Sequence, residues 1–138
     1  MTFRTAFEFN CCVVMREESE LKSLRPEIFS EQTTWTEIET FQNEVLRPIL
    51  KYQHDLILCL TQQEKLFQKQ MTNISSIAQK RDIIKRFFLS QQNYKYFLIG
   101  QICGLMTTNE FEFYLKAKKE LDKRITNMLA GRILSHYC

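Results

Sequence analysis

Apolar side chains recur at three- and four-residue steps along most of the 138-residue chain, with charged and amide side chains between them. This spacing places the apolar positions on one face of an α-helix. Only three glycines and two prolines interrupt the pattern, whereas a β-sandwich or barrel needs a turn about every 8–12 residues. The sequence therefore predicts an all-α fold, in which residues 1–138 form a single-domain bundle of four to five amphipathic helices.

The longest periodic segment runs from Trp35 to Met71 and predicts one long helix or two in series. A capping box at Thr34 and Glu37 predicts its start. Pro48 should kink this helix or begin a new one near Arg47, because proline has no backbone N–H to donate. The predicted buried stripe consists of Trp35, Ile38, Phe41, Val45, Ile49, Tyr52, Leu56, Leu60, Phe67 and Met71. A second apolar set lies off that stripe and comprises Leu46, Leu50, Ile57, Leu58 and Leu66.

Further helices are predicted in the second half of the chain. The polar break at 72–76 precedes an amphipathic helix with Ile77, Ile83, Ile84, Phe87 and Phe88. The segment from Tyr96 to Met106 is apolar almost all round, as expected of the central helix of a bundle. Its Gly100 and Gly104 should let a neighbouring helix approach closely. A capping box at Thr107 and Glu110 then opens a final helix, which should run unbroken to Ile133.

Near the N-terminus the pattern changes, because apolar residues occupy alternate positions from Phe3 to Met15. This alternation favours a strand or extended arm, and a helix is the alternative. No second strand is evident, so a strand here would need a mate from another chain or would pack over the helices. Residues 16–24 predict a short acidic helix that ends before Pro26.

Composition limits where the protein acts. Five cysteines show no regular disulfide framework, which favours a reducing compartment. No apolar run approaches the ~20 residues of a membrane span. The N-terminal segment lacks the basic region and cleavage site of a signal peptide. We therefore expect an intracellular protein, cytoplasmic or nuclear, without a membrane span.

No catalytic or metal-binding constellation stands out. His54 and His136 are isolated, and the sequence has no glycine-rich phosphate loop. Cys59 and Cys103 lie on apolar stripes and are interpreted as core residues, where burial suppresses the reactive thiolate. We therefore expect no enzymatic activity, no cofactor and no small-molecule substrate.

Charge is unevenly distributed. Residues 1–62 hold six Lys/Arg and ten Asp/Glu, whereas residues 63–138 hold thirteen and six, so the two parts carry −4 and +7. The basic part predicts either a solvated helix surface or a site for an acidic partner. As a nucleic-acid interface it would use Lys80, Arg81, Lys85, Arg86, Lys116, Lys119 and Lys123.

The leading hypothesis is a non-enzymatic protein–protein interaction module, that is, a helical adaptor, complex subunit or regulator. Its basis is the surplus of apolar positions, which predicts a hydrophobic face or groove for a partner protein or a second copy. The candidate partner-binding residues are Phe3, Phe7, Phe9, Trp35, Leu46, Leu50 and Ile57. Binding of nucleic acid by the basic part of the chain is the alternative.

Overall fold

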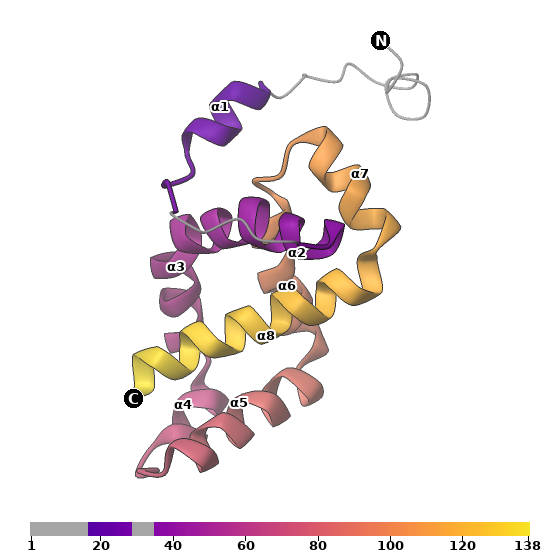
Figure 1. The fold of residues 1–138 in the computed structure, drawn as a ribbon. Coiled ribbons are helices and arrows are strands. Elements are labelled where there is room, and N and C mark those ends of the chain that lie inside the picture. Colours follow the sequence, from indigo (N-terminus) through magenta and orange to yellow (C-terminus); the bar gives the residue numbers. More distant parts are fainter. Residues whose placement is uncertain (1–16, 29–34) are drawn as a thin grey trace.

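The computed structural model describes residues 17–28 and 35–138, and all regular structure within them is helical (Figure 1). This confirms the predicted all-α class. The prediction for residues 3–15, including Phe3, Phe7 and Phe9, lies outside the described residues. The elements are α1 (Glu18–Ser23), α2 (Glu37–Phe41), the π-helical turn η3 (Gln42–Leu46), α3 (Arg47–Gln62), α4 (Lys65–Met71), α5 (Ile77–Ser90), α6 (Gln92–Cys103), α7 (Thr108–Lys116) and α8 (Lys118–Tyr137).

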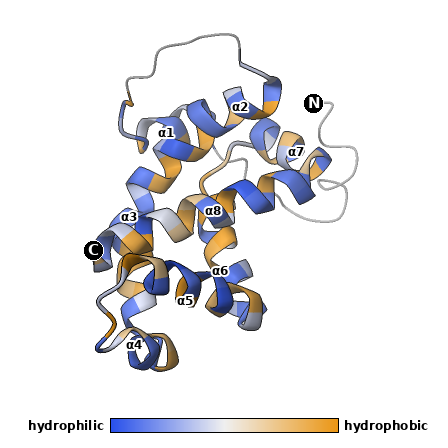
Figure 2. Cartoon of the chain, turned by 60° about the horizontal axis from the view of Figure 1, so that its bottom comes forward, coloured by the Kyte–Doolittle hydropathy of each residue, from blue (hydrophilic) through white to orange (hydrophobic). Residues whose placement is uncertain are grey.

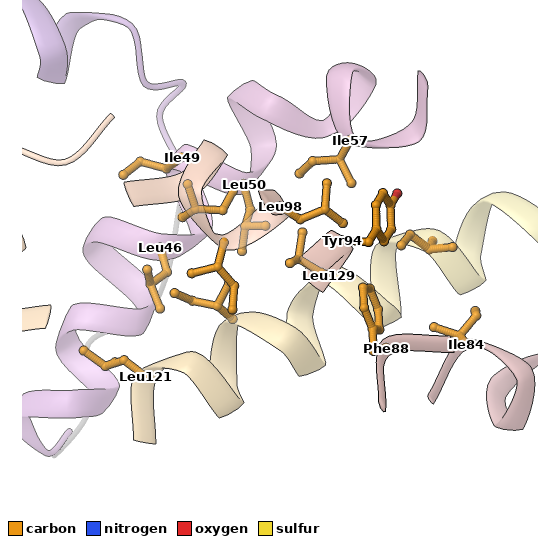
Figure 3. Close-up of a cluster of buried hydrophobic side chains, with 14 of the residues drawn as sticks. Leu46, Ile49, Leu50, Ile57, Ile84, Phe88, Tyr94, Leu98, Leu121 and Leu129 are labelled. Atoms are coloured by element: carbon orange, nitrogen blue, oxygen red, sulfur yellow. The ribbon is translucent and has the colours of Figure 1, made fainter. Parts of the chain in front are cut away.

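The hydrophobic core lies where α3, α5, α6 and α8 meet (Figure 3). Figure 2 shows hydrophobic and hydrophilic residues interspersed along these helices, as expected of amphipathic helices. The predicted central helix, α6, packs against the other three, but its Tyr96 and Phe97 are about half exposed. α8 contributes four core residues, Leu121, Ile125, Leu129 and Ile133, and also contacts α7. α6 is therefore at the centre of the fold, as predicted, together with the longer helices α3 and α8.

The one irregular turn in the continuous helix from α2 to α3 lies directly before Pro48. The Arg47 N–H donates to the carbonyl of Gln42, five residues back, which is the π-helical pattern. A regular turn would need an N–H at position 48, which proline lacks. The irregularity predicted near Arg47 is confirmed, and it takes the form of a π turn.

The π turn also shifts the buried face along α3, although five residues of the predicted stripe are buried as expected, namely Phe41, Val45, Ile49, Phe67 and Met71. It inserts one residue, so the stripe through Phe41 and Val45 continues through Leu50, Ile57 and Thr61, all of which are buried. Tyr52 and Leu56 on the predicted stripe are instead 48% and 42% exposed. A constant period of 3.6 residues cannot anticipate this shift.

Helix starts agree with the sequence in two places and differ in one. At Thr107 and Glu110 the capping box is confirmed, with reciprocal N–H bonds of 2.9 and 3.2 Å between each side chain and the other residue's backbone. Ser76 caps α5 through the N–H of Gln79. α2, however, is capped by Thr36, so it begins two residues later than the box at Thr34 predicted.

The predicted final helix is wrong as a single element, because it breaks at Ala117 into α7 and α8. The break brings the Tyr114 hydroxyl to donate to the carboxylate of Asp122, which also accepts from Lys118 at 2.6 Å. In an unbroken helix residues 114 and 122 would lie about 12 Å apart along the axis. The contact between these two side chains therefore depends on the break.

A buried ion pair joins α1 to the start of α7. Arg25 follows α1, whose end before Pro26 confirms the predicted short acidic helix. Its guanidinium donates to both carboxylate oxygens of Glu110, at 2.8 and 2.5 Å, and to the carbonyl of Leu105 at 2.9 Å. The two side chains are 7% and 14% exposed. Arg25 thus holds the segment after α1 against the capping box of α7.

Candidate interaction groove between α5 and α8

A groove of about 380 Å³ lies between α5 and α8, beside the start of α6. Apolar side chains make up much of its lining, and one of them, Leu89, is 71% exposed. The lining residues are Arg81, Ile84, Lys85, Phe88, Leu89, Lys95, Thr126, Asn127, Ala130, Gly131 and Leu134. The groove lies beside the contact between α5 and α8, and the α8 side of its lining includes the small residues Ala130 and Gly131.

The charge of the groove is of one sign. Arg81, Lys85 and Lys95 line it, and no acidic residue of the described chain does. An adjoining hollow shares Lys95 with the groove and adds two further lysines, Lys119 and Lys123. The groove therefore combines an apolar lining with a field that favours anions.

The exposed side chain of Tyr96 lines the adjoining hollow beside Lys95. The ammonium groups of Lys95 and Lys118 lie 4.7 and 5.3 Å from the centroid of its ring, within reach of a cation–π interaction. Neither Lys95 nor Leu89 was predicted as a site residue. Lys95 lies on a third helix, so its proximity to the basic residues of α5 arises only from packing.

The residues proposed for nucleic-acid binding are partly brought together. Arg81 and Lys85 line the groove, and Lys119 and Lys123 line the adjoining hollow. Lys80 is half-buried and donates to the backbone carbonyl of Tyr137 at 2.5 Å, so it is occupied within the fold. Arg86 and Lys116 are exposed but line neither hollow.

The residues proposed for partner binding are mostly placed elsewhere. Leu46, Leu50 and Ile57 are fully buried, so they belong to the core and offer nothing to a partner. The sequence interpretation was wrong for these three because the π turn moved them onto the buried face. Trp35 is half-buried and lines a separate hollow beside α2.

Gly131 lines the groove from the interior of α8. A Cβ atom built at this position meets nothing within 4 Å, so no packing in the fold requires glycine. Glycine inside a helix destabilises it by about 1 kcal/mol relative to alanine. The missing side chain leaves the groove open at a cost in stability.

Gly131→Ala is expected to raise the free energy of unfolding by about 0.5–1 kcal/mol, because alanine loses less backbone entropy and fits the open space. Urea denaturation followed by circular dichroism measures the change. Gly100→Ala is the matched control, since Gly100 lies inside α6 with equally open surroundings. A loss of stability at position 131 alone would show that the space is not free. The same openness at Gly100 contradicts the predicted close helix approach at that glycine.

Among residues 17–28 and 35–138, no group of three or more His, Cys, Asp or Glu is placed to hold a metal ion. Cys59 is exposed, so its interpretation as a core residue is wrong, again because the π turn rotates α3. Cys103 is half-buried, and burial raises the pKa of its thiol to about 11. Cys103 is therefore protonated at neutral pH and is a poor nucleophile.

No helix in the described part of the chain has the length and apolar character needed to cross a membrane. Comparison with protein-family models, curated proteins and solved structures gave no match to this chain. The groove between α5 and α8, which combines an apolar lining with three cations, is the strongest candidate for a binding site.

Proposed function

We propose that the chain is a non-enzymatic protein–protein interaction module whose groove between α5 and α8 binds an acidic, amphipathic helix of a partner protein. The observation that carries this proposal is the apolar lining flanked by Arg81, Lys85 and Lys95 with no acidic side chain among them. Amphipathic helices dock into such grooves through apolar residues at three- and four-residue steps.

The apolar lining of the groove matches the apolar face of such a helix, and its cations match the acidic edge. Apolar anchors would cover Leu89, whose full burial is worth about 1.5–3 kcal/mol. Glutamate and aspartate on the edge of the helix would face the three cations, which favours association and fixes orientation. A nucleic-acid backbone would satisfy the cations but would leave the apolar lining without a partner, and its charged phosphates lose hydration when buried.

Selection from a display library of helical 20-residue peptides tests this function. We expect enriched peptides to carry apolar residues at helical spacing together with an acidic edge. Arg81→Glu combined with Lys85→Glu should weaken their binding at least tenfold, because both cations line the groove. The control is Arg86→Glu with Lys116→Glu, which makes the same charge change at exposed sites outside it.

A fluorescent 20-nucleotide RNA, titrated in parallel at low salt, provides the competing outcome. If the RNA binds and no peptide family is enriched, the nucleic-acid alternative replaces the protein-interaction proposal. If the control pair weakens peptide binding as much as the groove pair does, the attraction is diffuse and the groove is not the site.

A further inference from the structure

A second hollow of about 350 Å³, distinct from the groove, lies where α2 passes α7. Three aromatic rings, two carboxylates and two smaller side chains surround it, and it shares no residue with the groove. The lining residues are Trp35, Glu37, Thr40, Phe41, Glu44, Val45 and Phe113. In Figure 1, α2 lies beside α7 on the side of the molecule away from α4.

Local helix geometry assembles this hollow. Glu37 and Phe41 of α2 lie one helical turn apart, and they line the hollow together with Glu44 of the π turn. Phe113 of α7 stacks on Phe41 with ring centroids 4.8 Å apart and planes 28° apart. Trp35 stands directly before the N-cap residue Thr36.

The electrostatics of the hollow favour a cation. The faces of aromatic rings are negative, and the Glu37 and Glu44 carboxylates carry full charges. No lysine or arginine of the described residues lines the hollow, and neither carboxylate pairs with a cation from that part of the chain. This negative field lies beside two half-buried aromatic rings, Trp35 and Phe113, and its sign is opposite to that of the field in the groove.

We infer that this hollow receives an arginine side chain of a partner protein. A guanidinium is planar and weakly hydrated, so it stacks on a ring while its N–H groups point outward in the ring plane. Glu37 and Glu44 are seven residues apart, about 10 Å along the helix, so one guanidinium stacks on a ring and pairs with one carboxylate. Lysine is a poorer fit, because its ammonium is compact and strongly hydrated.

Trp35 provides a direct readout, because it is the only tryptophan of the chain. The probe is the capped tripeptide acetyl-Gly-Arg-Gly-amide, titrated at low salt while tryptophan fluorescence is recorded. We expect a saturable change with the arginine peptide and about tenfold weaker binding of the citrulline peptide, which has the same shape without the charge. The lysine peptide should lie between them.

Two variants locate the site. Glu44→Gln should weaken binding of the arginine peptide about threefold to tenfold, because it removes one of the two carboxylates. Glu112→Gln makes the same charge change next to Phe113 at an exposed position outside the hollow, and it should leave binding unchanged. The absence of a saturable signal up to about 50 mM peptide would overturn the inference, because a still weaker affinity would not indicate a specific site. Equal responses to arginine and citrulline, or equal effects of the two variants, would do so as well.

Discussion

Replacing Arg25 by alanine is expected to lower the free energy of unfolding by about 3 kcal/mol, the low end of the usual effect of breaking a buried ion pair. The variant leaves the Glu110 carboxylate, whose side chain is 14% exposed, without its cation. It also removes the donor to the carbonyl of Leu105. The loss should not reach the upper end of that range, since α1 buries a single side chain, Leu21, and can detach to let water reach Glu110.

Chemical denaturation measures this loss, with Lys22→Ala as the matched control. Lys22 pairs with Glu18 at 3.2 Å on the same helix, but the two side chains are 54% and 55% exposed. An exposed pair of this kind contributes about 0–0.5 kcal/mol. The double variant Arg25→Ala with Glu110→Ala should lose less than the sum of the single variants, because it leaves no unpaired buried charge. Equal effects of Arg25→Ala and Lys22→Ala would contradict the buried pair.

The ion pair also predicts how stability responds to acid. Burial by itself raises the pKa of Glu110, but the bonds from Arg25 and from the N–H of Thr107, with the charge of Arg25, outweigh burial and lower it below 4.5. A carboxyl group with a depressed pKa stabilises the fold at neutral pH, and this contribution is lost as the pH falls below 4.5 through the folded-state pKa. Arg25→Ala should flatten that part of the stability–pH curve.

Local sequence signals predicted several helix boundaries, although the box at Thr34 placed the start of α2 two residues too early. The box at Thr107 and Glu110 forms because its two bonds lie within four residues. Pro48 marked the irregular turn, since a missing N–H acts on its own helix. The breaks at Glu64 and Ala117 have no glycine or proline beside them. The break at Ala117 allows the bond from Tyr114 to Asp122, a contact between side chains eight residues apart that helical periodicity does not indicate.

The binding surfaces were harder to predict. They depend on which face of each helix is turned toward the core and on packing between helices that are distant in the sequence. One inserted residue in η3 moved Leu50 and Ile57 into the core and Leu56 to the surface. The sequence identified Arg81 and Lys85 as basic neighbours on α5, but it did not indicate that Lys95 would join them across another helix. Nor did it distinguish Gly131, which lines the groove, from Gly100, which has equally open surroundings but does not line it.

Gly131→Phe is expected to weaken binding of selected acidic peptides by about thirtyfold or more, the effect of losing a strong anchoring contact of about 2 kcal/mol. The new ring would extend into the groove, because a Cβ atom at this position has open space around it. Stability should not fall, since phenylalanine is a better helix former than glycine. Binding measured by fluorescence anisotropy, together with urea denaturation, separates these two effects.

The control is Gly100→Phe, which adds the same ring at an equally open helical position outside the groove. It should leave peptide binding unchanged, and a loss there would mean that an added ring disturbs binding from any site. Charge substitutions at Arg81 and Lys85 act over several ångströms, so they identify a region, whereas a side chain at position 131 acts only on what occupies the groove. If peptides bind Gly131→Phe normally but fail to bind the charge variant, the basic surface is the binding site and the apolar groove is not.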